Sequence, residues 1–312
     1  MKTLFLNIFV FFCMTTHIAA QDFASRFGQI VQRMDTERYR PFSLIMEMNA
    51  ENLQDSLIPL LKQYETFPNS LVQEKIYQSY FDYGMKSTDT TFKKQMMKNL
   101  LNAGAYPDSI ELSYACSYSI DLLFQFENNL FDQDVIDTIN HRIKNNPRFD
   151  LDYAYLSGRL YQYQMIPVFE ELLLKETNDR TIYRWHTILA RLSNEESINF
   201  VRKYLQELSI DTRLLQQGET YAYVRQKPVI DILFDDLESE ARGPEYFEPW
   251  MEKPLAGSLR AYNVMDILTR LIKDFPVQYR DRRKNMSFTE EELEIARAWA
   301  KIHKNDYEII KE

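Results

Sequence analysis

Three stretches of this chain share one apolar pattern: LYQYQMIPVFEELL at 160–173, LSNEESINFVRKYL at 192–205 and VRQKPVIDILFDDL at 224–237. Each stretch begins 32 residues after the one before it. Within each, apolar residues recur at spacings of three and four, which is typical of one face of an α-helix. The shared residues are Leu160, Ile166, Phe169 and Leu173, then Leu192, Ile198, Val201 and Leu205, then Val224, Ile230, Leu233 and Leu237. One helical pair cannot bury both of its apolar faces, so a pattern repeated at this period predicts stacked pairs.

The pattern extends to both sides of these stretches. Its second apolar position falls at Ile58, Phe92, Ile136, Ile166, Ile198, Ile230 and Val264. We therefore predict an all-α protein of about six or seven antiparallel helix pairs. First helices are expected at 151–163, 180–192, 212–224 and 255–262, and second helices at 166–175, 195–208, 228–238 and 264–275. Seven glycines in 312 residues agree with this, because antiparallel β-proteins need many glycine turns.

One segment resembles a known repeat family. ARLSNEESI at 190–198, followed by Val201 and Leu205, resembles a HEAT repeat of the short kind. That family's pattern is Ala-x-Leu-Gly, a turn with Asp or Asn and Glu, and then Ala-Ile-x-x-Leu-x-x-x-Leu. Ser193 and Ser197 stand where the family usually has Gly and Ala. The match covers residues 150–240, while 40–145 and 255–275 agree only in period.

The resemblance implies a right-handed α-solenoid whose second helices line the concave face. Most members of the family are scaffolds that bind proteins or peptides, and a minority, among pigment lyases and related enzymes, do chemistry. The repeat itself carries neither role.

The first twenty residues have the composition of a cleaved signal peptide. Lys2 supplies the positive charge, residues 4–14 are nearly all apolar, and Ile18-Ala19-Ala20 is an acceptable cleavage site. An apolar run of about eleven residues is too short to span a bilayer. We therefore expect cleavage after Ala20, no transmembrane segment in the mature chain, and a periplasmic or secreted location.

Four regions follow from these patterns. They are a signal peptide at 1–20, an N-terminal helical region of divergent repeats at 21–145, a HEAT-like array at 146–275 and a C-terminal region at 276–312. The array is interrupted at 240–254, where prolines, acidic residues and aromatics indicate an insertion. The C-terminal region has a basic loop around 280–284, and then a capping helix that the capping box of Thr289 and Glu292 opens.

Charge and cysteine content limit the partner and the compartment. Removal of residues 1–20 takes away one lysine and no acidic residue, so the net charge moves from −9 to −10. This balance argues against nucleic acid as a partner, because binding to it needs clustered Lys and Arg. Cys116 is the single cysteine left, so no internal disulfide can form, which suits a bacterial periplasm.

The usual chemical motifs are absent from the sequence. His141, His186 and His303 are far apart, and none has metal-ligand spacing, so we predict no metal and no cofactor. Cys116 lies between Tyr114 and Tyr118 and is expected to be a buried thiol. Adjacent carboxylates such as 170–171 and 235–236 could serve a glycosidase-like reaction only if a cleft held them in register. No catalytic residue can be assigned.

Aromatic and charged residues of the array are the candidate binding residues. Tyrosine is suited to a surface that is apolar at one end and wet at the other, although many of these rings could equally fill the core between repeats. Charges on the second helices would give a concave face of mixed sign. The candidates are Tyr155, Tyr161, Glu171, Trp185, Arg202, Lys203 and Asp235, with Tyr246 and Trp250 in the insertion.

These observations lead to one main functional hypothesis and two alternatives. The main one is an exported binding or scaffold protein with a protein or peptide partner. The first alternative is an enzyme, a lyase or hydrolase, with paired carboxylates and tyrosine in the groove. The second is a structural subunit of an envelope complex that docks through the insertion at 240–254.

Overall fold

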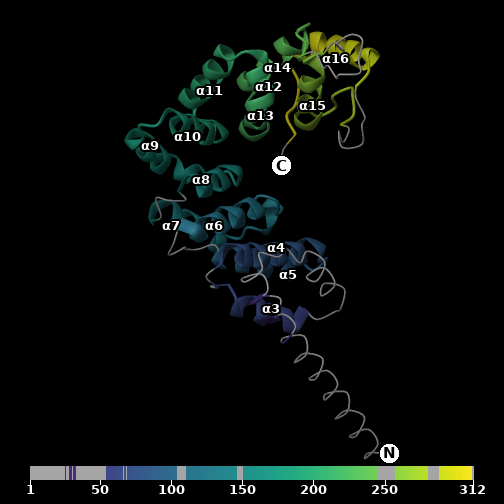
Figure 1. Cartoon of the computed structure of the whole chain (residues 1–312). Coiled ribbons are helices and arrows are strands. Elements are labelled where there is room, and N and C mark those ends of the chain that lie inside the picture. The colour runs from purple at the N-terminus through teal and green to yellow at the C-terminus, as the bar shows by residue number, and fades with distance from the viewer. Residues whose placement is uncertain are drawn as a thin grey trace, which may run out of the picture. The chain divides into compact units, whose positions relative to one another are not determined.

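The structure, a computed structural model, describes residues 25, 28–29, 31–32, 54–65, 67, 69–103, 110–145, 150–244, 257–279 and 288–310. These residues form helices and no β-strand apart from two isolated bridges, which confirms the predicted all-α class (Figure 1). The chain divides into two compact units, Met1–Asp137 and Thr138–Glu312. The predicted signal peptide at 1–20, the basic run at 280–284, Tyr246 and Trp250 lie outside the described residues.

The first unit is built around the helix α4. Asn69 caps α4, because its side chain accepts hydrogen bonds from the amides of Leu71 and Val72. Helix α4 packs on both α5 and α6. Its Tyr80 is fully buried and donates a hydrogen bond to the carboxylate of Glu65. The helices of this unit are α3 (Gln54–Gln63), α4 (Ser70–Lys86), α5 (Thr90–Ala103), α6 (Ile110–Leu123) and η1 (Asn128–Leu130), followed by α7 (Gln133–Asn145), which continues into the second unit.

The second unit contains two layers of helices. In the first layer α8, α10, α13 and α15 contact one another in succession. In the second layer α11 contacts α14, while α9 and α11 pack on α10. Figure 1 shows α8, α10 and α13 on the side of this unit toward the C-terminus, and α9 and α11 on the other side. The bounds are α8 (Asp150–Arg159), η2 (Tyr163–Met165), α9 (Ile166–Lys175), α10 (Asp179–Arg191), α11 (Glu195–Glu207), α12 (Ile210–Gln216), α13 (Gly218–Val224), α14 (Lys227–Leu237), α15 (Ala261–Leu271) and α16 (Glu290–His303).

The 32-residue period is visible in the backbone. Tyr161, Ser193 and Arg225 are each 32 residues apart and have φ angles of 55°, 63° and 51°. Each of them follows a first-layer helix and itself has a left-handed backbone conformation. A residue in this conformation is a common way to end a helix. Glycine adopts this conformation without a steric cost, yet this chain places a side chain at all three positions.

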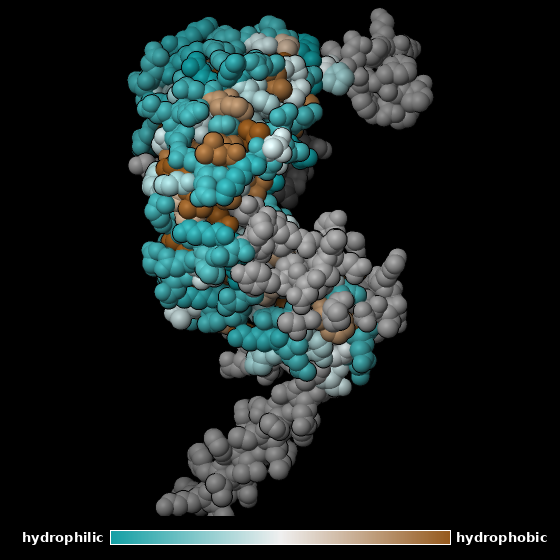
Figure 2. Space-filling view, turned by 90° about the vertical axis from the view of Figure 1, so that its left-hand side faces the viewer, coloured by the Kyte–Doolittle hydropathy of each residue, from teal (hydrophilic) through white to brown (hydrophobic). Residues whose placement is uncertain are grey.

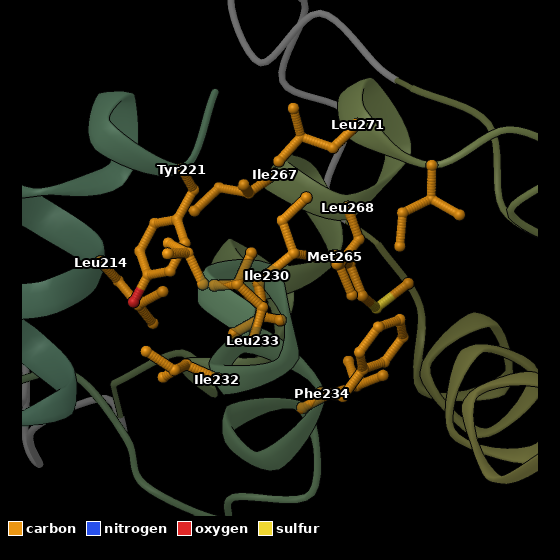
Figure 3. Packing of buried hydrophobic residues seen from close by; sticks show 14 of the residues in the cluster. Leu214, Tyr221, Ile230, Ile232, Leu233, Phe234, Met265, Ile267, Leu268 and Leu271 are labelled. Atoms are coloured by element: carbon orange, nitrogen blue, oxygen red, sulfur yellow. The ribbon is translucent and has the colours of Figure 1, made fainter. Parts of the chain in front are cut away.

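The repeated apolar residues form the core of the unit. All members of the second and third stretches are buried, and Ile230 and Leu233 face Met265 and Leu268 (Figure 3). In the first stretch Phe169 is fully buried, whereas Leu160, Ile166 and Leu173 are half-buried.

The structure departs from the sequence prediction at two places. The helix expected at 212–224 is split into α12 and α13 at Gln217, next to Gly218, which is a poor helix former. The bounds expected for the pair at 255–262 and 264–275 are wrong, because residues 257–260 are not helical, Leu259 forms an antiparallel bridge with Arg242, and one helix, α15, spans Ala261–Leu271. A Cβ atom on Gly257 would lie 2.0 Å from the carbonyl oxygen of Gly243, so the two backbones lie too close together for a side chain at Gly257.

Candidate binding surface

Five residues of the first layer form a tyrosine–arginine cluster. They are Tyr155 on α8, Tyr161 in the turn after α8, Arg184 and Arg191 on α10, and Tyr223 on α13. Consecutive contacts of α8, α10 and α13 bring them together, although they span 69 positions of the chain. Two of them, Tyr155 and Tyr161, were predicted from the sequence as binding residues.

Arg191 is the buried centre of this cluster. It is 1 % exposed, and its Nη1 donates a 2.6 Å hydrogen bond to the backbone carbonyl of Tyr223. Its guanidinium carbon lies 4.5 Å from the ring centroid of Tyr161 and 5.6 Å from that of Tyr223. Such contacts are cation–π interactions, which are strengthened by removal from water. Arg191 therefore fixes both rings.

A second set of contacts holds Tyr155. The Tyr223 hydroxyl donates to the backbone carbonyl of Tyr155 over 2.8 Å, and the two ring centroids are 4.8 Å apart. Arg184 lies over the Tyr155 ring at 5.2 Å and donates to Asp152 over 3.1 Å. A Cβ atom on Gly158 would lie 2.3 Å from the Tyr223 hydroxyl oxygen, so this hydroxyl needs a glycine there.

The cluster is partly open to solvent. The rings of Tyr155, Tyr161 and Tyr223 are half-buried, and the Arg184 side chain is 39 % exposed. Tyr163, which is 52 % exposed, stacks on Tyr161 with the ring planes 28° apart. Burial raises the pKa of the Tyr155 phenol, which the nearby Arg184 partly offsets. This phenol is therefore neutral near pH 7 and is suited to hydrogen bonding rather than to action as a base.

The other predicted binding residues lie apart from the cluster. Trp185 is buried against Phe169, with ring centroids 5.8 Å apart, so its side chain belongs to the core. The charged candidates are on second-layer helices: Glu171 pairs with Lys175, Lys203 approaches Glu207, Asp235 pairs with Lys304, and Arg202 is exposed.

The second layer also exposes apolar side chains. Figure 2 views the molecule from the side on which α9 and α11 lie in Figure 1, and it shows hydrophobic residues among hydrophilic ones. Leu174 on α9 is 86 % exposed, and Phe200 on α11 is also exposed. The Phe200 ring stacks on His186 at 3.8 Å, so part of its surface is covered.

The arrangement of groups that could do chemistry does not form an open catalytic site in the parts described. His186 lies 3.0 Å from the Ser197 hydroxyl, but Ser197 is only 2 % exposed and cannot meet a substrate. The neighbouring carboxylates Asp235 and Asp236 have separate partners, because Asp236 pairs with Arg213. Cys116 is a buried thiol that takes part in no disulfide, as the sequence indicated.

The residues that the structure describes contain no group of three or more His, Cys, Asp or Glu side chains placed to hold a metal ion. No helix in those same ranges has both the length and the apolar character that crossing a membrane requires.

Sequence reasoning missed Arg184, Arg191 and Tyr223 as members of one site. A signal was present, because Asp152 and Arg184 are 32 residues apart and so are Arg191 and Tyr223. Comparison of polar residues at equivalent repeat positions would have suggested that they meet. Comparison with protein-family models, with curated proteins and with solved structures finds no match to this chain.

Proposed function

We propose that this chain is an exported scaffold protein whose tyrosine–arginine cluster binds a protein or peptide partner. The observation that carries the proposal is a set of half-exposed tyrosine rings fixed by a buried arginine. Tyrosine and arginine are enriched among the residues that dominate binding energy at interfaces. Rings that are already ordered lose little conformational entropy when a partner binds.

The proposed architecture is a right-handed α-solenoid of the HEAT-like kind. Three left-handed turns at a 32-residue spacing support it, as do the successive contacts of α8, α10, α13 and α15. In such a stack each repeat contacts its neighbours, and the long surface that results suits an extended partner.

The binding proposal is tested by capture of partners from the native cell envelope. The bait is the purified chain, compared with the single variants Tyr163→Ala, Arg184→Ala and Arg202→Ala. Arg184 is a partly exposed member of the cluster and the exposed Tyr163 stacks on its Tyr161, whereas Arg202 is an exposed arginine on the second layer. We expect the first two variants to lose the partner and the third to keep it. Equal capture by all three would contradict the proposal.

Export is tested separately by N-terminal sequencing of the chain isolated from its own cells. Cleavage after Ala20 places Gln21 at the new N-terminus. A chain that retains residues 1–20 would contradict export by a cleaved signal.

A role as a structural subunit of an envelope complex is a second candidate. Two backbone hydrogen bonds at the base of the insertion favour it. The amide of Gly243 donates to the carbonyl of Ser258 over 2.9 Å, and the amide of Arg260 donates to the carbonyl of Ala241 over 2.8 Å. This pairing holds residues 241–243 next to residues 258–260. Replacement of 245–256 by a Gly-Ser linker should then remove partners from the captured set, and an unchanged set would end this idea.

A further inference from the structure

Residues 304–310, here called the clasp segment, follow α16 and contact α14, the end of α15 and Arg225, the residue that follows α13. The amide of Lys273 donates to the carbonyl of Glu308 over 2.9 Å, and the amide of Ile310 donates to the carbonyl of Leu271 over 2.8 Å. Ile309 and Ile272 thus form an antiparallel β-bridge. The clasp segment is therefore held by its main chain, as peptides are when they add a strand to a protein.

One side chain of the clasp segment is an anchor. Tyr307 is 4 % exposed, and its ring packs against Phe234 with centroids 5.1 Å apart. Its hydroxyl lies 3.0 Å from Asp231 Oδ1 and 3.2 Å from the carbonyl of Lys227. Asp231 and the Lys227 carbonyl are both acceptors, so this pocket selects a tyrosine over a phenylalanine.

Charged groups surround the anchor. Arg225 donates from Nη1 to the carbonyl of Ile310 over 2.6 Å. Lys273 pairs with Glu308 at 2.8 Å, outside the pocket. The groove thus has three features. An apolar pocket holds the Tyr307 ring, Lys273 pairs with the acidic residue that follows it, and Arg225 donates to the backbone carbonyl of Ile310.

The clasp segment is held less firmly than the helices beneath it. Tyr307 is its buried residue, Ile309 is half-buried, and Glu308 and Ile310 are exposed. Tyr307 belongs to the same core cluster as the buried residues of α14 and α15, so the clasp segment is held by this one buried side chain and by main-chain hydrogen bonds. Segments with few buried contacts open locally at a lower free energy than the whole fold.

We propose that the groove formed by α14, the end of α15 and Arg225 is a peptide-binding site. Its ligand is an extended peptide with a tyrosine, an acidic residue and two branched apolar residues in succession, the pattern of Tyr307-Glu308-Ile309-Ile310. In the absence of a partner, the clasp segment fills the site. The site shares no residue with the tyrosine–arginine cluster. The peptide-binding proposal and the proposed function of the cluster can therefore be disproved independently.

The test uses a fluorescent peptide, KNDYEIIKE, with the sequence of residues 304–312. The full chain with Tyr307→Ala loses the anchor of its own clasp segment and should leave the groove free. We expect this variant to bind the peptide at least about tenfold more tightly than the unmodified chain, because an occupied groove lowers the apparent affinity by its open fraction. Binding is measured by fluorescence anisotropy.

Two controls accompany this measurement. The peptide KNDAEIIKE lacks the anchor and should not bind. The variant Tyr279→Ala removes an exposed tyrosine outside the groove and should behave as the unmodified chain. A folded Tyr307→Ala variant that binds no better than the unmodified chain, or that binds both peptides equally, would overturn the proposal.

A measurement on the unmodified chain decides the case in which Tyr307→Ala does not fold. The amide of Lys273 bonds the clasp segment, whereas the amide of its neighbour Ile272 bonds Leu268 within α15. If the clasp segment opens separately, the Lys273 amide should exchange its hydrogen at least about tenfold faster than the Ile272 amide after correction for intrinsic rates. Equal protection of the two amides would overturn the proposal.

Discussion

Arg191 donates a 2.6 Å hydrogen bond from Nη1 to the backbone carbonyl of Tyr223, the residue 32 positions later. A buried arginine thereby links α10 to α13 and holds the Tyr161 ring at the same time. The contact joins two properties of this unit, which are the packing of α10 on α13 and the order of its surface tyrosines.

Replacement of this arginine should therefore destabilise the chain. Arg191→Ala removes the hydrogen bond and both ring contacts, and leaves a cavity, so we expect a loss of about 2 to 4 kcal/mol in the free energy of unfolding. Urea denaturation followed by circular dichroism measures it. Arg202→Ala changes an exposed arginine and should alter that free energy by less than about 0.5 kcal/mol. Equal effects of the two changes would show that Arg191 does not link α10 to α13.

Gly158 and Tyr223 should be coupled. Gly158→Ala places a Cβ atom 2.3 Å from the Tyr223 hydroxyl oxygen, so we expect a destabilisation of about 1 to 3 kcal/mol from overpacking. Tyr223→Phe removes that oxygen, and the double variant should recover much of the loss. Thermal melting of the four chains gives the coupling energy as a double-mutant cycle. Additive effects of the two changes would mean that the Tyr223 hydroxyl is not what requires a glycine at position 158.

The left-handed turns should respond to glycine. Ser193 has a φ angle of 63°, a conformation that costs a residue with a side chain about 1 to 2 kcal/mol. Ser193→Gly relieves this cost, while the greater freedom of glycine in the unfolded chain and the loss of a hydrogen bond from Gln226 offset part of it.

We expect a net gain of roughly 0.5 kcal/mol in the free energy of unfolding for Ser193→Gly. The matched control is Ser197→Gly on α11, where glycine weakens a helix and should destabilise the chain by about 1 kcal/mol. A loss of stability in both variants would contradict the interpretation of Ser193 as a strained position.

The pair of Glu65 and Tyr80 should give the first unit a pH dependence. Burial raises the pKa of the Glu65 carboxyl above its ordinary value of 4.5, and the hydrogen bond from Tyr80 opposes this only in part. A raised pKa means that the folded chain holds this proton more tightly than the unfolded chain does. The stabilising contribution of the Glu65 carboxyl to the free energy of unfolding is therefore full below pH 4.5. It is lost as the pH rises through the folded-state pKa of this carboxyl.

Glu65→Gln should remove this dependence, because glutamine does not titrate. We expect the unfolding free energy of the unmodified chain to fall more steeply from pH 4.5 upward than that of the variant. Denaturation at a series of pH values measures the two slopes. Glu195→Gln, which changes an exposed carboxylate of the other unit, should keep the original slope. Parallel slopes for all three chains would contradict the assignment to Glu65.

The helical class and the core of the second unit could be predicted because they follow from local spacing. Ile198, Val201 and Leu205 repeat at intervals of three and four, and all three are buried in α11. The half-buried state of Leu160, Ile166 and Leu173 could not be predicted, because their spacing is the same as that of their buried counterparts. Their exposure depends on which other elements pack against Leu160 and against α9, and the spacing does not encode this.

The candidate surface could be predicted only in part. Tyrosines suggested Tyr155 and Tyr161, but composition gave the same weight to Trp185, whose side chain is in the core. Helical periodicity assigns a side chain to one face of its own helix and says nothing about the partner of that face. Arg191 meets Tyr161 and Tyr223 only because α8, α10 and α13 stack in succession.

The sequence by itself determined the helices, their period of 32 residues and the apolar residues that form the core, because each depends on residues a few positions apart. Only the tertiary structure decided that Arg191 lies between two tyrosines, that Gly158 makes room for a hydroxyl from α13, and that Tyr307 returns to Phe234. These contacts join residues 30 to 73 positions apart, and such pairs are fixed by the packing of whole helices rather than by local spacing.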